Sequence, residues 1–148
     1  RIDGSTGKAS IGAEGILGPN GLCFSPDEKI LYIIESRGVP TRRILAYDVS
    51  ASGEKLSNKR TFVDAGPGTP DGMRADIDGN LWCGWGMGDP ELDGVVVFAP
   101  DGVMIGRIAL PERCANLCFG GVKRNRLFMA ASQSIYALYV NTQGALGG

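Results

Sequence analysis

The sequence predicts an all-β fold made of repeated units of short strands. Glycine is frequent, at 23 of 148 residues, and it separates many short apolar runs, as in chains with numerous tight turns. No long segment shows the 3.6-residue periodicity of an amphipathic helix, which argues against a helical solenoid. The motif Pro19-Asn20-Gly21-Leu22 returns 51 residues later as Pro70-Asp71-Gly72-Met73. Together these three observations predict a β fold with internal repetition.

The first unit follows the Pro19-Asn20-Gly21 turn. Its expected strands are residues 22–24, 30–35, 43–49 and 60–63. The second of these runs is mostly apolar, as in a buried strand, and the third alternates as a half-exposed strand does. Upstream, residues 1–7 are interpreted as the end of a strand and a turn, and residues 8–13 as one more outer strand. The chain is therefore expected to begin in the remnant of a preceding unit.

The second unit is organised around a hairpin that follows the repeated motif. Pro70 fixes φ before the turn, and Gly72 can adopt conformations that a residue with a Cβ resists. Asp78-Gly79 is a strong hairpin-turn signal. The expected strands are residues 73–76, 81–84, 95–99 and 104–109. Asp76 and Asp78 lie at the opposite end of the hairpin from the motif, and we expect them, like Trp82, to be structural.

A third unit begins near Ala115, which lies 44 residues after Asp71. Its expected strands are residues 114–119, 126–131 and 134–140, and no fourth strand is expected before Gly148. A period of about 40–50 residues with four short strands per unit is typical of β-propeller blades. We therefore expect residues 1–148 to form one partial propeller domain whose N-terminal blades are missing. A β-sandwich is the alternative, because it also contains short strands joined by regular turns.

The repeat places two polar side chains at equivalent positions. In a propeller the first strand of each blade lines the central axis. Asn20 and Asp71 stand where the chain enters this strand in neighbouring units, so we expect them to converge at the mouth of the channel. For either residue alone, an Asx-turn that bonds its own backbone is the ordinary alternative. Their amide and carboxylate oxygens suit calcium, which takes about 6–8 oxygen ligands.

Four motifs, spread over nearly the whole chain, carry a resemblance to a known family. They lie at residues 19–22, 70–82, 116–121 and 135–138. In order and spacing this set resembles the gluconolactonase/regucalcin/luciferin-regenerating family. The resemblance implies a six-bladed β-propeller, of which this chain supplies roughly half, about three blades. It also implies one divalent cation in the central channel, usually Ca²⁺, with Zn²⁺ or Mg²⁺ as alternatives.

The resemblance further implies an activity and its ligands. Members of the family hydrolyse lactones, and the related diisopropyl fluorophosphatases hydrolyse organophosphates. Their metal is held by a Glu, by the Asn that matches Asn20 and by the Asp that matches Asp71. The Glu, and a further Asn that contacts substrate, are expected upstream of Arg1. A sugar lactone is the expected substrate. The alternatives are an organophosphate or ester hydrolase, or a propeller that binds calcium or a partner without turnover.

The chemistry of such a site gives each candidate residue a role. A cation would polarise the lactone carbonyl and stabilise the oxyanion. Asp71 is the candidate catalytic residue, as a general base on water or as a nucleophile. The sequence contains no histidine, so the chain holds no Ser-His-Asp triad. The candidate substrate contacts are Asn116, at the start of the third unit, and Arg37 and Met87, in loops between second and third strands.

The composition bears on partners and on the compartment. A net charge of −1 without blocks of like charge gives no support to binding of nucleic acid or an anionic membrane. No apolar run approaches the ~20 residues needed to span a bilayer. The 4 cysteines form no Cys-x-x-Cys pair, which predicts buried free thiols in a reducing compartment and favours the cytoplasm. The open strand edges of a partial propeller predict that residues 1–148 alone are unstable or pair with another chain.

Overall fold

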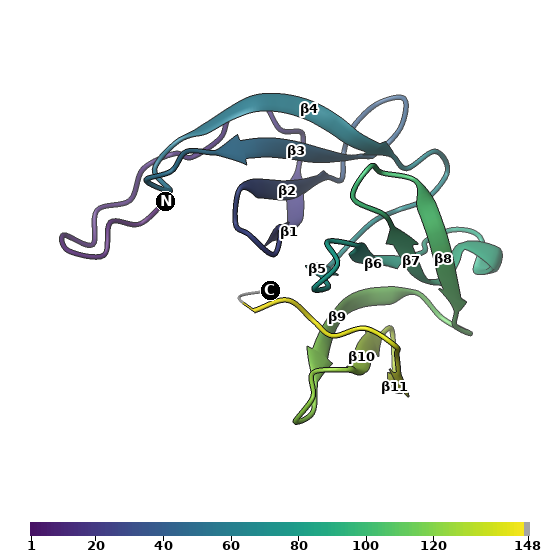
Figure 1. Ribbon diagram of the computed structural model, residues 1–148. Coiled ribbons are helices and arrows are strands. Elements are labelled where there is room, and N and C mark those ends of the chain that lie inside the picture. The colour runs from purple at the N-terminus through teal and green to yellow at the C-terminus, as the bar shows by residue number, and fades with distance from the viewer. Residues whose placement is uncertain (147–148) are drawn as a thin grey trace.

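The chain forms an all-β fold in a computed structural model that describes residues 1–146 (Figure 1). Eleven strands are found in this part of the chain, and they build three antiparallel sheets. The first sheet contains β1 (Pro19–Phe24), β2 (Ile30–Glu35), β3 (Arg43–Val49) and β4 (Leu56–Asp64) in that order. The second contains β5 (Met73–Ala75), β6 (Leu81–Trp85), β7 (Gly94–Phe98) and β8 (Met104–Ala109). The third contains β9 (Cys114–Gly120), β10 (Arg126–Ala131) and β11 (Ile135–Tyr139).

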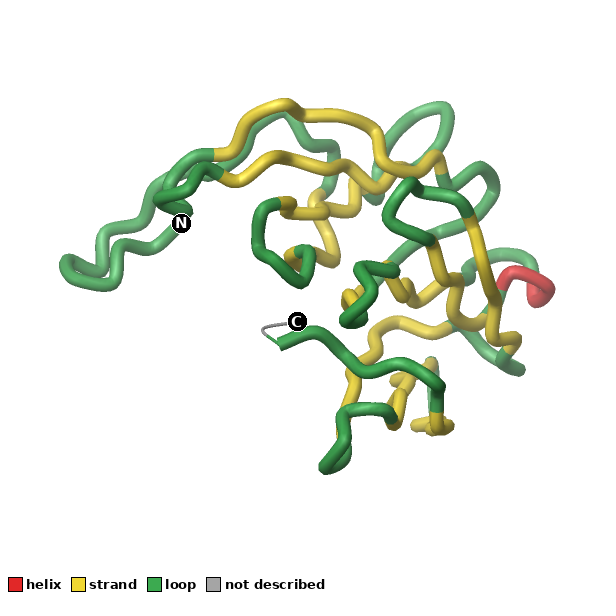
Figure 2. The backbone as a smooth tube through the Cα atoms, in the orientation of Figure 1, coloured by secondary structure: helices red, strands yellow, loops and turns green. Residues whose placement is uncertain are grey.

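Within residues 1–146 the one helical element is the 3₁₀ turn η1 (Pro90–Leu92), drawn red in Figure 2. The described residues contain no helix of the length and hydropathy that a membrane crossing requires. Strands β2, β3, β8 and β10 have the bounds that the sequence predicts. The expected outer strand at residues 8–13 is wrong: Ala9 makes a single bridge with Ile2 and the segment is otherwise irregular. A strand needs a ladder partner, and this segment lies near the face of the first sheet, where there is no strand edge to pair with.

The three sheets are successive blades of a β-propeller, here called blades 1, 2 and 3. Their first strands lie innermost, with β1 beside β5 and β5 beside β9 (Figure 1). The approach is close because glycines stand at the contacts. A Cβ at Gly21 would overlap the carbonyl oxygen of Asp71, and the Gly72 N–H donates to the carbonyl of Ala115 at 2.8 Å. The repeated Asn-Gly and Asp-Gly pairs therefore serve blade packing as well as turn formation.

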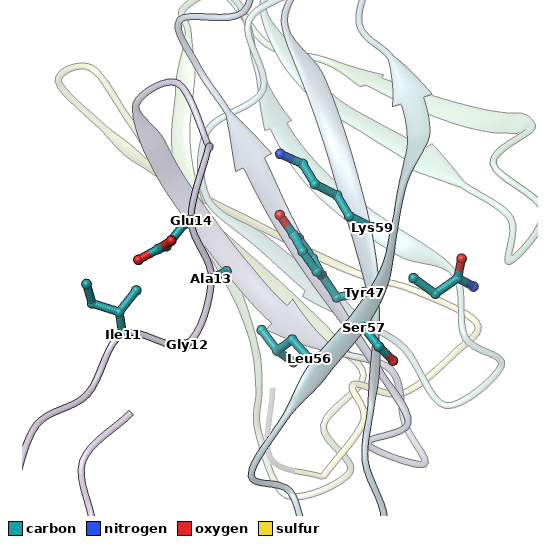
Figure 3. Close-up of a pocket in the computed structure, with 9 residues that line it drawn as sticks. Ile11, Gly12, Ala13, Glu14, Tyr47, Leu56, Ser57 and Lys59 are labelled. Carbon is teal, nitrogen blue, oxygen red and sulfur yellow. The ribbon is translucent and has the colours of Figure 1, made fainter.

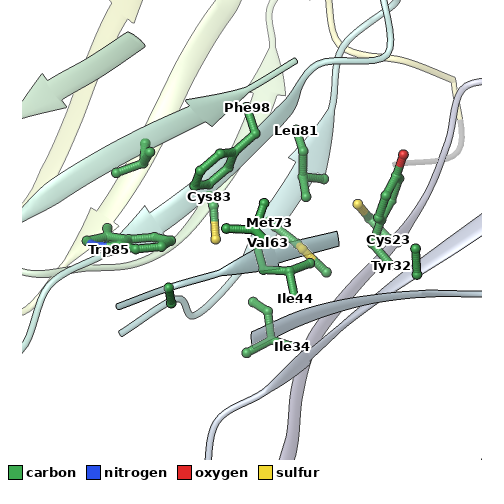
Figure 4. Close-up of a cluster of buried hydrophobic side chains, with 13 residues drawn as sticks. Cys23, Tyr32, Ile34, Ile44, Val63, Met73, Leu81, Cys83, Trp85 and Phe98 are labelled. Atoms are coloured by element: carbon green, nitrogen blue, oxygen red, sulfur yellow. The ribbon is translucent and has the colours of Figure 1, made fainter. Parts of the chain in front are cut away.

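Apolar side chains fill the space between blades (Figure 4). Ile34 and Ile44 from blade 1 and Met73 and Leu81 from blade 2 are completely buried in one cluster. A second cluster joins blades 2 and 3 through Val95, Cys114, Leu117, Leu127 and Met129. Burying one such side chain contributes about 1.5–3 kcal/mol, so these two clusters are the main force that sets one blade against the next.

The outer faces of the two end blades differ. On blade 1, Tyr47 lies under the N-terminal segment, where Ala13 packs and the Lys59 Nζ donates to the carbonyl of Gly15 at 2.6 Å (Figure 3). On blade 3, Ile135 and Tyr139 are exposed. The face of blade 1 is thus partly covered by its own chain, whereas the face of blade 3 is open.

The chain after β11 returns to blade 2 instead of extending blade 3. The Ile77 N–H donates to Gln143 and the Ala145 N–H donates to Ala75, at 2.9 and 3.0 Å. Up to residue 146, no fourth strand lies beside β11, as the sequence predicts.

All four cysteines are free thiols. Cys23, Cys83 and Cys114 are buried, as expected, but the expectation of burial is wrong for Cys118, which is exposed. Its side chain stands on the open face of blade 3, where no neighbouring sheet covers it among the described residues.

Candidate metal and substrate site

Asn20 and Asp71 meet at the inner edge of blades 1 and 2. Asn20 lies in β1, and Asp71 stands just before β5, held by its N–H bond to the carbonyl of Gly84 at 2.9 Å. The Asn20 Nδ2 donates to Asp71 Oδ1 at 3.0 Å. Two side chains separated by 51 residues are therefore in direct contact, as their equivalent positions in the repeat predict.

Arg113 is a third member of this site, and sequence reasoning missed it. It precedes β9 of blade 3, and its Nη2 donates to Asp71 Oδ2 in an ion pair. The Asp71 side chain is 18% exposed and that of Arg113 is 32% exposed. Each carboxylate oxygen of Asp71 thus accepts from a different blade, and three blades converge on one carboxylate.

Glycines make room for this convergence. A Cβ on Gly72 would lie 2.8 Å from the Cα of Asn116, and a Cβ on Gly86 would lie 2.9 Å from the Cγ of Arg113. Gly86 also has a φ of +145°, in the region that favours glycine. The β6–β7 loop can therefore approach the stem of Arg113 closely.

The three candidate substrate contacts occupy different places. Asn116 packs against Gly72, next to Asp71, while its Oδ1 accepts from the Leu117 N–H at 2.9 Å. Arg37 is exposed in the β2–β3 loop, where its side chain covers Gly18. Met87 is 51% exposed in the β6–β7 loop. Among the described residues, none of the three hydrogen-bonds the Asp71 side chain, and Asn116 is the one that packs against Gly72, the residue next to Asp71.

A buried ion pair supports the blade 1 side of the site. Glu35, at the end of β2, is 1% exposed; it pairs with Arg43 and accepts from the Leu17 N–H at 3.0 Å. Burial opposes its ionisation, but these hydrogen bonds and the Arg43 charge outweigh burial and lower the pKa of Glu35. Because Leu17 leads into β1, the pair fixes the segment that delivers Asn20.

The donor atoms at the site fit part of an oxygen-ligated cation site. The Asp71 carboxylate retains free lone pairs, and rotation of the Asn20 amide would present its Oδ1. Burial raises the pKa of Cys114 to about 11 and that of Cys83 further, so these nearby thiols stay protonated. Across residues 1–146 no group of three or more Cys, Asp or Glu side chains could hold a metal, so Asn20 and Asp71 supply at most two ligands.

Comparison with known proteins identifies relatives of this chain. The SMP-30/Gluconolactonase/LRE-like region family model matches residues 1–133. A gluconolactonase of Zymomonas mobilis is 33% identical over 148 residues, which cover 93% of this chain and 39% of that protein. The structure of a gluconolactonase from Xanthomonas campestris has a TM-score of 0.72 and 32% identity over 85% of this chain and 39% of that chain. A luciferin-regenerating enzyme has a TM-score of 0.82 over 97% of this chain and 52% of that chain; at 24% identity it supports the fold alone.

The chain spans well under half the length of the curated relatives it matches, and 39% to 52% of the two solved chains. Three blades over about half of a relative's length agree with the six-bladed propeller expected from the sequence. With most of its residues matched by the family model and with this fold, the chain belongs to the SMP-30/gluconolactonase/LRE-like family.

Proposed function

We propose that the site around Asp71 performs metal-dependent hydrolysis of a sugar lactone. The observation that carries the proposal is the contact between Asp71 and Asn20, which brings two oxygen-bearing side chains from neighbouring blades to one point. Relatives named as lactonases support the reaction class. Calcium is the cation we favour, because both ligands offer oxygen and calcium accepts flexible oxygen coordination.

In this proposal each residue of the site has a different role. Asp71 and Asn20 would hold the cation, which would supply Lewis-acid polarisation of the lactone carbonyl. A remaining Asp71 lone pair accepts a proton from the water that attacks the carbonyl carbon. The ring C–O bond then breaks, and the proton passes to the ring oxygen to give the open hydroxy acid. Asn116, beside Asp71, orients the substrate, and Arg37 and Met87 border its approach from the loops.

We also propose that the 148 residues act as one half of a closed ring. A six-bladed propeller needs three further blades, which would supply additional ligands and cover the ends of the arc. Ile135 and Tyr139 on blade 3 and Leu22 on blade 1 are exposed at those ends. Pairing through these faces, with another segment of the same protein or with a second chain, would bury them.

The test measures hydrolysis of gluconolactone by the purified protein before and after chelation of metal. We expect chelation to abolish the activity, Ca²⁺ to restore it, and Asp71→Asn to lower it at least ~100-fold. Asp101→Asn, in the exposed β7–β8 turn, is the matched control and should leave the rate unchanged. Activity that resists chelation would refute the metal role, and activity on diisopropyl fluorophosphate alone would assign the site to the organophosphate hydrolases.

A further inference from the structure

The ion pair between Arg113 and Asp71 leaves the guanidinium incompletely hydrogen-bonded. Its Nη2 donates to Asp71 Oδ2, while its Nε is buried and has no partner within the described part of the chain. Arginine and a carboxylate bind most strongly through two parallel N–H donors, and here the second donor is unused. A buried donor without an acceptor is unfavourable. Charge, more than a completed set of hydrogen bonds, therefore holds Arg113 in this position.

The Arg113 side chain is only partly buried. Its stem lies against Gly86, where the missing side chain makes room for the methylene groups. The side chain as a whole is 32% exposed, so it is not enclosed by the blades.

The charges at the site make Arg113 a competitor of any bound cation. Asn20 is neutral, and the positive charge of Arg113 is paired with the negative charge of Asp71. The Asp93 carboxylate lies near the Arg113 stem, since a Cβ at Gly86 would meet both. A divalent cation on the same carboxylate would be repelled by the guanidinium at short range. A cation on Asp71 therefore weakens the ion pair between Asp71 and Arg113, and Arg113 in turn weakens the binding of the cation.

We infer that Arg113 is a displaceable counter-ion of Asp71. It neutralises and orients the carboxylate when no metal is bound, and it leaves Oδ2 when a divalent cation binds. The inference rests on the proposed function, because it requires a cation at Asp71 and Asn20. Arg113 is then a positioning residue that sets the metal affinity of the site through competition.

The experiment titrates the purified protein with CaCl₂ by calorimetry and compares the wild type with four variants, which are Arg113→Met, Arg113→Lys, Arg107→Met and Asp71→Asn. Arg113→Met removes the charge but keeps the apolar stem, and we expect it to bind Ca²⁺ at least ~10-fold more tightly. Arg113→Lys keeps the positive charge but lacks the planar guanidinium. Its Ca²⁺ affinity should lie between those of the wild type and Arg113→Met. Arg107→Met removes an exposed arginine from the outer strand β8, and its Ca²⁺ affinity should stay within about twofold of the wild-type value. Circular dichroism confirms that each variant is folded.

Each outcome decides the inference. Tighter binding by Arg113→Met supports it, including the case in which the wild type binds too weakly to measure. Equal or weaker binding by Arg113→Met overturns it; if Asp71→Asn still abolishes binding, the proposed function survives this result. Absence of Ca²⁺ binding in the wild type and in Arg113→Met overturns the inference together with calcium as the cation.

Discussion

Two aspartates at the two ends of β5 have opposite surroundings. Asp76 is completely buried, and its four donors all come from the hairpin that follows it: the N–H groups of Asp78 and Asn80, the Asn80 amide and the Trp82 indole. Asp71 is partly exposed, and its two side-chain donors come from blades 1 and 3. Local donors that bury a carboxylate build a turn. Distant donors that leave it accessible build a site for a ligand.

The largest expected effect is a difference in the free energy of unfolding between the Asp76→Asn and Asp71→Asn variants. Asp76→Asn replaces a doubly accepting carboxylate with a group that has one acceptor and adds donors where donors already point. We expect it to lower the free energy of unfolding by about 3 kcal/mol or more. Asp71→Asn should lower it by less than ~1 kcal/mol, because the side chain is partly solvated. Urea unfolding of both variants measures the difference.

Equal losses of unfolding free energy in the two variants would contradict the distinction between them, because Asp71 would then be as important for stability as Asp76. An unchanged urea midpoint for Asp76→Asn would show that the four donors find other partners. The hairpin would then not depend on this carboxylate.

A smaller effect is expected from removing one of the donors to Asp76. Trp82→Phe removes the indole N–H from Asp76 but keeps an aromatic ring against Phe119, whose centroid lies 5.6 Å away in an edge-on arrangement. We expect a loss of about 1 kcal/mol in unfolding free energy and an unchanged Ca²⁺ affinity. A changed affinity in a folded Trp82→Phe variant would mean that the two ends of β5 are coupled.

The repeat explains which parts of the site the sequence could predict. Asn20 and Asp71 stand at the same position of neighbouring units, so propeller geometry alone brings them together. Arg113 escaped prediction because its position carries no repeated residue type: the equivalent positions hold Gly18 and Thr69. Nothing in the spacing indicates that a long side chain from the third unit reaches back to the second.

The strands show the same limit. The bounds of β2 and β3 are correct because their apolar residues record them. The prediction that β3 is half exposed is wrong, because one face packs toward blade 2 and the other lies in the cluster under the N-terminal segment, so residues 44–47 are all buried. Residues 8–13 have a strand-like composition but no strand edge to pair with, and composition does not report whether such a partner is present. Glu35 could have been found from the β2–β3 hairpin, since its register places it opposite Arg43. The apolar pattern of residues 30–35 alone does not indicate this pair.

The most direct measurement is a crystal structure of the protein grown with Ca²⁺, with the ion identified by anomalous scattering. The account predicts a cation about 2.3–2.6 Å from an oxygen of Asp71 and from the amide oxygen of Asn20, with the Arg113 guanidinium moved off Oδ2. A calcium ion bound elsewhere, with Asn20, Asp71 and Arg113 still joined as they are here, would contradict it.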